Sequence, residues 1–291
     1  MSQFPEEPLN LPSSEGFGYY PAYPGLKFKE GRYEVIRKLG YGPRSSVWLV
    51  EDLRCAYLRI FLFHLFWLSP DRSGEFGLLA LKILTARATL EKWRELRRLK
   101  AVKRLRNFTG LPNLHDHFCE NSHHGNHLCF GLSVLGPSIE DLRQSLPTKT
   151  LPVHVVQRVV GSILEALERL HHNQIIHCGM YLCLPPRNYL YYWQKLTHTL
   201  LLFNIAVIHD NICTFVFQTK DDLDPVLATL PPCTIERKVT VDGVEYPIVR
   251  SQPIPHNLNL NDTHMDTRFY LNNLAYGTLC VVLSSLTWWS V

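Results

Sequence analysis

Apolar and polar residues alternate over two short stretches on either side of a glycine-rich turn near the start of the chain. The stretch YEVIRKLGYGPRSSVWLVEDL, which begins at Tyr33, predicts two strands of a hairpin. The run LLALKIL (78–84) is apolar enough to predict a third, buried strand. Residues 1–32 are rich in Pro, Gly, Ser and Tyr and lack periodicity, so we expect an extended arm with order beginning at Tyr33.

Two helices are expected further along. Residues 89–106 predict a helix with Leu96 and Leu99 on one side and eight Lys or Arg between Lys92 and Arg106. A solvated outer face explains these cations, and an acidic partner or nucleic acid is the alternative. Residues 152–173 predict a second helix. Its apolar stripe at spacings of four and three is Val156, Val160, Ile163, Leu167 and Leu170.

Three further strand regions complete the pattern. Residues 111–118 and 127–135 are expected to be strands, and the sequence KVTV-DG-VEYPIV (238–249) predicts a hairpin. Its Asp-Gly pair suits a type I′ turn, because both central residues of that turn need positive φ.

Composition narrows the class of protein. The chain has 291 residues, of which 46% are hydrophobic and 19% charged, which is typical of one large or two modest globular domains. A net charge of +4 is too small to indicate direct nucleic-acid binding. The eight cysteines include no CxxC pair, so we expect neither a zinc site nor a disulfide framework. The apolar runs 56–68, 196–208 and 278–291 are too short to predict a membrane span.

The candidate chemistry begins in the glycine-rich turn. In the sequence LGYGPRSSV (39–47), Gly40 and Gly42 would let backbone N–H groups approach phosphates closely, with Ser45 at the place of a third glycine. Val47 could pack on an adenine ring. Lys82 lies inside an apolar strand, where a charge is costly to bury unless it is paired. Glu95, on the following helix, is the expected carboxylate partner.

The sequence HLCFGLSVLGPSIEDL (127–142) predicts a strand that runs into a hinge and a short helix. We expect Leu132 to be the gatekeeper of a nucleotide site. The backbone groups of Ser133 and Leu135 are expected to face the adenine base of the nucleotide. The helix over 152–173 is followed by LHHNQIIH, in which His177 occupies the first position of a kinase catalytic triplet.

With these motifs the chain resembles the SR-protein kinases, serine/threonine kinases of arginine–serine-rich splicing factors, in a fungal-type branch. The resemblance rests on YPGLKFKEGRYEVIRKLGYGPRSSVWLVED, LALKIL, VLGPSIEDL, LERLHHNQIIH and VEYPIVRSQPIP. It implies an α+β, two-lobed kinase-like fold, with an antiparallel-sheet N-lobe that carries one helix and an incomplete helical C-lobe. The implied domains are the arm (1–32), the N-lobe (33–135), a partial C-lobe (136–277) and an apolar tail (278–291).

The resemblance also implies ATP with Mg²⁺ as cofactors and transfer of the γ-phosphate to Ser or Thr. Arg/Ser-rich proteins are the implied substrates, and the cytoplasm or nucleus is the implied location. The implied nucleotide-binding residues are Leu39, Gly40, Gly42, Val47, Lys82, Glu95, Ser133 and Leu135.

The chain departs from the family at the catalytic loop. On the family pattern Ala206 stands where the catalytic aspartate belongs, and Ile208 where the lysine belongs. Asn211 retains a magnesium-ligand position, whereas Asn273 replaces the metal-binding aspartate with a neutral, weaker ligand. Asp210 is one residue before Asn211 instead of five, so its carboxylate is not expected to act as the base.

Two inserts, 55–73 and 178–205, interrupt otherwise continuous motifs, and their apolar, aromatic character suggests translated introns. Three functions therefore stay open: an ATP-binding serine/threonine kinase, a catalytically inactive pseudokinase or binding module, and a mis-spliced gene product without a stable fold. A histidine cluster (His115, His117, His123, His124 and His127) lacks the spacing of a metal-ligand set and is interpreted as loop polarity.

Overall fold

The computed structural model describes residues 6–54, 77–91, 93–104, 110–173, 175–176, 212–213, 225–255, 260, 269–271 and 278–279. The chain divides into two units. The first comprises Met1–Trp93, Pro112–Gly136 and Val216–His256, and the second comprises Arg94–Leu111, Pro137–Phe215 and Asn257–Val291.

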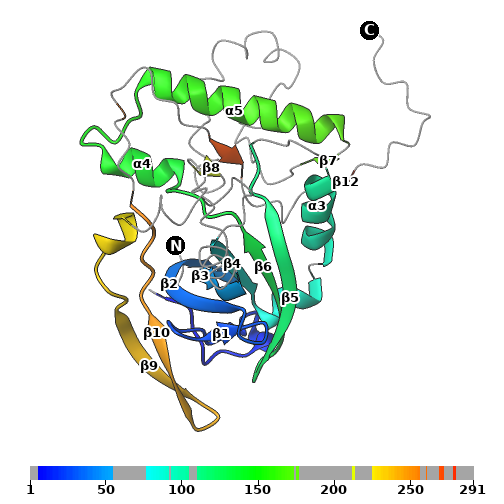
Figure 1. Cartoon of the computed structure of the whole chain (residues 1–291), viewed down its shortest axis with the longest axis vertical. Helices are drawn as coiled ribbons and strands as arrows, with labels where there is room; N and C mark the ends of the chain where they lie inside the picture. The colour runs from blue at the N-terminus through cyan, green and yellow to red at the C-terminus, as the bar shows by residue number, and fades with distance from the viewer. Residues whose placement is uncertain are drawn as a thin grey trace, which may run out of the picture. The chain divides into compact units, whose positions relative to one another are not determined.

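A six-stranded antiparallel sheet in the order β1-β2-β3-β4-β6-β5 forms the centre of the first unit (Figure 1). Its strands are β1 (Lys27–Phe28), β2 (Tyr33–Gly42), β3 (Ser45–Asp52), β4 (Leu78–Leu84), β5 (Leu114–Ser122) and β6 (Gly125–Leu132). The strands predicted for 33–52 and 78–84 are confirmed. The predicted strands 111–118 and 127–135 are shifted, because the Gly125 turn (φ 115°) sets the β5–β6 hairpin.

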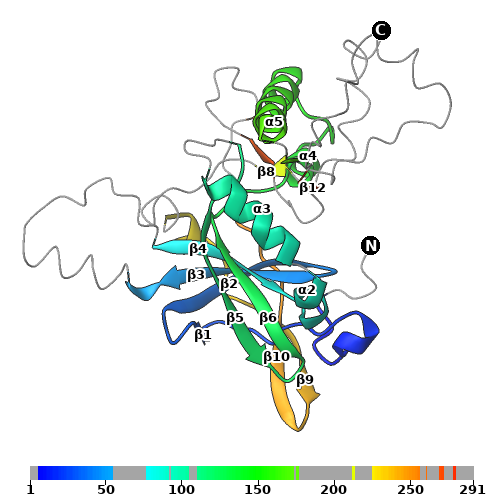
Figure 2. The same ribbon diagram turned by 90° about the vertical axis from the view of Figure 1, so that its right-hand side faces the viewer.

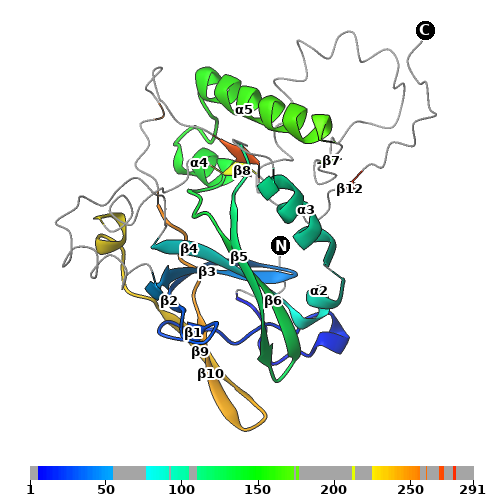
Figure 3. The same cartoon turned by 45° about the vertical axis from the view of Figure 1, so that its right-hand side comes forward.

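Both faces of this sheet carry buried apolar residues, because successive side chains along a strand point to opposite faces. On one face the largest buried residues are Trp48, Tyr33 and Phe28. On the other face Leu49, Ala80 and Val134 pack with Ile254. A short helix, α2 (Ala86–Glu91), follows β4 and lies against β6 (Figure 3).

The prediction that order begins at Tyr33 is wrong for residues 6–32. Leu9, Tyr19, Ala22 and Phe28 are buried, a 3-10 turn (η1) spans Ser13–Glu15, and β1 pairs with β2. The error has a physical cause: aromatic residues spaced irregularly in a Pro- and Gly-rich segment leave no periodic pattern, yet each finds an apolar partner on the sheet.

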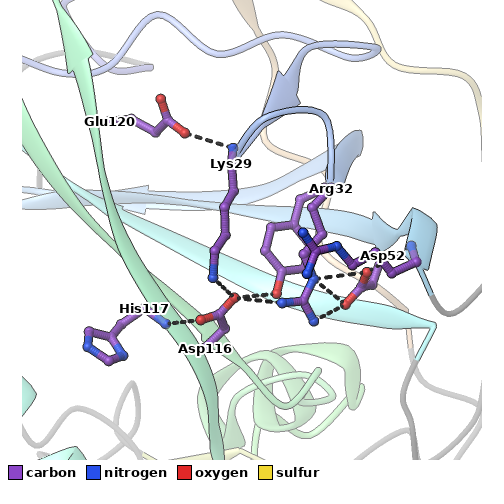
Figure 4. A network of polar contacts seen from close by, with 8 residues as sticks. Lys29, Arg32, Asp52, Asp116, His117 and Glu120 are labelled. Atoms are coloured by element: carbon purple, nitrogen blue, oxygen red, sulfur yellow. Dashed lines mark hydrogen bonds and ion pairs between the residues drawn. The ribbon is translucent and has the colours of Figure 1, made fainter.

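A polar network fixes the β1–β2 turn to the sheet (Figure 4). The Lys29 ammonium lies 2.5 Å from Oδ2 of Asp116 on β5, and the Tyr33 hydroxyl donates to the same oxygen at 2.6 Å. Arg32 binds both carboxylate oxygens of Asp52 on β3. Burial raises the pKa of Asp116, but the hydrogen bonds from Lys29 and Tyr33 outweigh it and leave that pKa lowered. The network is structural, because its charges satisfy one another.

The predicted 238–249 hairpin is confirmed as β9 (Ile235–Val241) and β10 (Val244–Val249) (Figure 2). Asp242 and Gly243 have φ of 49° and 80°, as a type I′ turn requires. Much of the hairpin is exposed, whereas Ile248 and Val249 at its end are buried.

The second unit contains the helices α3 (Trp93–Arg104), α4 (Ile139–Ser145) and α5 (Val153–His172). The sequence predicted one helix over 89–106, whereas the structure has two: α2, which begins earlier at Ala86 and ends at Glu91, and α3, which spans Trp93–Arg104. Leu96 and Leu99 are buried as predicted, and Arg97, Lys100 and Lys103 are exposed. Arg98, however, is only 7% exposed, so the interpretation of a wholly solvated basic face is wrong at that residue.

Helix α5 confirms the predicted 152–173 helix but corrects its buried stripe. The buried residues are Val155, Val159, Ile163, Ala166 and Leu170. Val156, Val160 and Leu167 are only partly buried. Adjacent valines at 155–156 and 159–160 make two phases equally apolar in sequence, and the smaller Ala166, close to Gly110, decides between them.

Short strand pairs complete the described residues of the second unit: β7 (Ile175–Ile176) with β12 (Thr278–Leu279), and β8 (Ile212–Cys213) with β11 (Tyr270–Leu271). Within the described part of the chain, no helix is long and apolar enough to cross a membrane.

Candidate nucleotide site

One row of directly paired residues crosses five strands of the sheet. Gly40 pairs with Val47, Val47 with Lys82, Lys82 with Phe130, and Phe130 with His117. Paired residues on neighbouring strands point to the same face of a sheet. The glycine, the valine and the lysine that the sequence singles out therefore share one face.

The glycine-rich turn closes tightly, with Gly42 opposite Ser45 and only Pro43 and Arg44 between them. Neither Gly40 nor Gly42 adopts positive φ, and a Cβ built at either position meets no atom within 4 Å. The protein's own packing and backbone therefore do not require glycine at these positions. The open space beside both Cα atoms leaves room for a ligand to approach the backbone.

Lys82 is half-buried between Leu81 and Ile83, which are 0% and 1% exposed. These neighbours point to the opposite face, where they join Trp48 in the core. On its own face Lys82 is flanked by Ala80, two residues away on β4, which packs with Leu49 and Val134. The lysine thus stands at the edge of an apolar surface.

The apolar part of this face includes other predicted residues. Leu39 and Val47 pack against the cluster of Leu49, Ala80 and Val134. Leu132, the predicted gatekeeper, pairs with Ala80 across β4 and β6, so its side chain points to the same face.

The predicted hinge, Ser133 and Leu135, leaves the sheet at the end of β6. Ser133 is 4% exposed, and its N–H donates to the carbonyl of Asn113 at 3.1 Å. Its hydroxyl contacts His115 Nε2 at 3.0 Å. Ser138 caps α4 through a capping box with Asp141, which satisfies backbone N–H groups at the start of that helix.

Glu95 is 2% exposed on the inner side of α3. It belongs to the second unit, whereas Lys82 belongs to the first. The predicted Lys82–Glu95 ion pair therefore stays a prediction.

The candidate catalytic and metal positions Ala206, Ile208, Asp210, Asn211 and Asn273 lie outside the described residues, as do His177 and the whole of the two inserts, 55–73 and 178–205. Among the described residues no group of three or more His, Cys, Asp or Glu is arranged to hold a metal ion.

The histidine cluster has ordinary structural partners. His127 contacts the Leu84 carbonyl at 2.8 Å and the Ser122 hydroxyl at 2.7 Å, and burial lowers its pKa to about 4. His124 contacts the Leu9 carbonyl at 2.8 Å. Polarity at a hairpin turn, the interpretation made from the sequence, fits His123 and His124, but it is wrong for His127, which is 0% exposed on β6.

A buried ion-pair cluster on β2, the strand that carries Gly40, was not predicted from the sequence. Lys38, two residues before Gly40, is 0% exposed and forms ion pairs with Glu6 and Glu7. The available signal was weak: a lysine in the alternating pattern of β2 and two acidic residues in a segment without periodicity.

Comparison with known proteins confirms the resemblance to SR-protein kinases. The chain is 33% identical over 174 residues to protein kinase dsk1 of Schizosaccharomyces pombe, a match covering 60% of this chain and 29% of that protein. It is 30% identical over 171 residues to mouse SRSF protein kinase 3, covering 55% of this chain and 26% of that protein. The chain thus spans less than a third of the length of these relatives.

A crystal structure of a kinase domain matches with a TM-score of 0.48 and 16% identity, covering 90% of this chain and 55% of that one. No family model matches the chain. The α+β, kinase-like fold expected from the sequence, with an antiparallel-sheet N-lobe and few C-lobe helices among the described residues, is the fold observed.

Proposed function

We propose that this protein-kinase-like chain binds ATP on the sheet face that carries Gly40, Val47 and Lys82. The observation that supports it is the cross-strand row that brings these three residues, separated in sequence, to one face beside an apolar surface. The similarity to SR-protein kinases favours the same function.

In this proposal each group has a distinct task. Leu39, Val47 and Ala80 offer apolar contact to the base, and the backbone of Ser133 and Leu135 orients it at the hinge. The backbone N–H groups at Gly40 and Gly42 face the phosphates. Lys82 supplies positive charge, and a charge-assisted hydrogen bond at a partly desolvated site is about twice as strong as a neutral one.

Magnesium would neutralise the phosphates in the family reaction. The predicted ligands for it are Asn211 and Asn273. Two neutral amides attract Mg²⁺ less than carboxylates do, so we expect ATP to bind with little dependence on the metal.

Nucleotide-dependent thermal shift on the purified chain tests ATP binding. We expect millimolar ATP to raise the unfolding temperature, and Lys82→Met to reduce that rise clearly by weakening ATP about tenfold or more. The matched control is Lys27→Met, which removes an exposed lysine of β1 from the same sheet and should leave the rise intact. A wild-type chain that unfolds cooperatively without any ATP response contradicts the proposal. A chain without cooperative unfolding favours a mis-spliced product.

The reaction that follows binding separates two candidates. Serine/threonine kinase activity toward Arg/Ser-rich proteins is the function of the family that the chain resembles. A pseudokinase is favoured by the family pattern, on which Ala206 takes the position of the catalytic base; an alanine side chain cannot accept a proton from the substrate hydroxyl.

We therefore expect phosphoryl transfer close to background. Transfer of labelled γ-phosphate to an Arg-Ser repeat peptide measures it, with a Ser→Ala peptide as the control for hydrolysis. Incorporation that depends on Lys82 would identify an active kinase instead and would place the base elsewhere in the chain. On either outcome the expected location is the cytoplasm or nucleus.

A further inference from the structure

The strand that leads into the glycine-rich turn carries a completely buried charge. Lys38 Nζ lies 2.6 Å from Oε2 of Glu6 and also contacts Oε2 of Glu7. It donates in addition to the Val249 carbonyl at 2.9 Å. A buried ammonium needs such partners, because desolvating it alone would cost several kcal/mol.

The segment after β10 joins the same cluster. Glu6 accepts hydrogen bonds from the Ser251 N–H at 2.6 Å and from its hydroxyl at 2.8 Å. The Gln252 N–H donates to the Lys38 carbonyl at 3.0 Å. Residues 6–7, 38 and 249–252 are thus bound together, although almost the whole described chain separates them in sequence.

A second set of contacts holds the turn itself. The Tyr19 hydroxyl donates to the Gly42 carbonyl at 2.8 Å. Tyr41, between the two glycines, packs on the cluster of Leu9, Tyr19 and Ile248, with its ring edge-on to Tyr19 at 6.5 Å. The Gly42 carbonyl and the Tyr41 side chain therefore fix the turn to the rest of the protein, while the space beside the Cα atoms of Gly40 and Gly42 stays open.

We propose that Glu6, Glu7, Tyr19 and Lys38 are positioning residues that hold the glycine-rich turn in its nucleotide-binding shape. The inference rests on the proposed function, since it concerns the affinity of the same site. We call these four residues the turn clamp.

The physical reason is conformational entropy. A turn with two glycines has large backbone freedom, and a ligand that must order it loses affinity accordingly. A clamp that orders the turn before binding removes that loss. In this cluster the Lys38 ammonium faces two carboxylates, those of Glu6 and Glu7. Burial raises the pKa of Glu7 despite the attraction of Lys38. Lys38 is nevertheless held by three partners, the carboxylates of Glu6 and Glu7 and the carbonyl of Val249.

Tyr19→Phe on the full chain tests the clamp with the smallest change, since it removes one hydroxyl. The matched control is Tyr33→Phe, which removes a hydroxyl bonded to Asp116 at 2.6 Å on the same sheet but away from the turn. We expect Tyr19→Phe to speed amide hydrogen exchange at residues 40–44 and to weaken ATP about fivefold, the effect of one hydrogen bond. Tyr33→Phe should leave both unchanged, although both variants lower the unfolding temperature. The proposal of a turn clamp is overturned if the two variants change ATP affinity equally, or if Tyr19→Phe leaves amide hydrogen exchange at the turn unchanged.

A second variant removes the ionic part without leaving a lone buried charge. The triple substitution Glu6→Gln, Glu7→Gln and Lys38→Met replaces the cluster with neutral groups of similar size. We expect the same faster exchange at residues 40–44, and protection equal to wild type overturns the ionic part of the clamp. Exchange is measured without nucleotide, so it tests the clamp even if ATP fails to bind wild type. That failure alone would instead contradict the proposed function.

Discussion

Lys82 of β4 lies directly opposite Val47 of β3, and Val47 in turn lies opposite Gly40 of β2. The register therefore brings the expected phosphate-binding and base-binding groups to one face of the sheet. A register slip by one residue would move Lys82 to the face that holds Trp48 and Leu81.

Gly42→Val separates ligand binding from folding. A Cβ at Gly42 meets no protein atom within 4 Å, and the backbone φ there is not positive, so the unfolding temperature should stay that of wild type. If phosphates use the open space, the larger side chain should weaken ATP about tenfold or more, about 1.4 kcal/mol. Titration calorimetry and thermal melts measure the two effects.

Gly110→Ala is the contrasting variant. Gly110 has φ of 96°, and its Cβ would lie 3.0 Å from the Ala166 side chain, so this change should lower the unfolding temperature. A loss of stability in Gly42→Val comparable to that of Gly110→Ala would show that the turn needs glycine for folding instead.

The alternating strands could be predicted because each has one consistent period, and the same holds for the Asp242–Gly243 turn, whose residues tolerate positive φ. The arm could not be predicted. Its buried residues, among them Tyr19 and Phe28, are fixed by tertiary contacts with the sheet and not by a local repeat. The candidate site residues Gly40, Val47 and Lys82 could be predicted because their spacing is characteristic, whereas Lys38 needed the fold to reveal Glu6 and Glu7 as its partners.

His127 should make stability depend on pH. In the folded chain it is neutral, with its two ring nitrogens bonded to Leu84 and Ser122, and burial lowers its pKa from 6.5 to about 4. The unfolded chain therefore binds a proton at His127 more tightly than the folded chain does. The contribution of the neutral ring to the free energy of unfolding is complete above pH 6.5 and is lost as the pH falls toward 4. We expect a loss of about 2 kcal/mol between pH 7 and 5.

Urea unfolding at several pH values measures that loss. The groups around the ring are His123 and His124, which add to the lowering of its pKa, and the aromatic ring of Tyr20. His127→Asn should flatten the pH profile, whereas replacing the exposed His171 in the same way should not. Identical profiles for wild type and His127→Asn would contradict the neutral, buried state.

Asp116→Asn should destabilise the first unit. The Asp116 carboxylate accepts hydrogen bonds from Lys29, Arg32 and Tyr33. Its pKa is lowered in the folded chain, so the stabilisation from these bonds is present above the ordinary pKa of 3.8 and is lost as the pH falls below that value. We expect a loss of about 1–3 kcal/mol at neutral pH, as for a charged hydrogen-bonding group that is removed. Glu34→Gln, which breaks the exposed 3.6 Å pair with Lys27, should cost well under about 1 kcal/mol. Similar losses for both variants would mean that the network in Figure 4 contributes little.

Deletion of residues 55–73 tests whether that insert is needed for the sheet. The Asp52 N–H donates to the Gly77 carbonyl at 2.9 Å, so the ends of β3 and β4 already lie side by side. The deletion leaves residues 53, 54 and 74–77 between the two strands, a short connection for antiparallel neighbours. Because closing a shorter loop loses less entropy, we expect the deleted form to fold and to gain about 1 kcal/mol in free energy of unfolding. ATP response in the thermal-shift assay should persist, since no nucleotide-site residue lies in the deleted segment. A deleted form that aggregates or loses cooperative unfolding would show that the insert contributes to the core, which would argue against its origin as a translated intron.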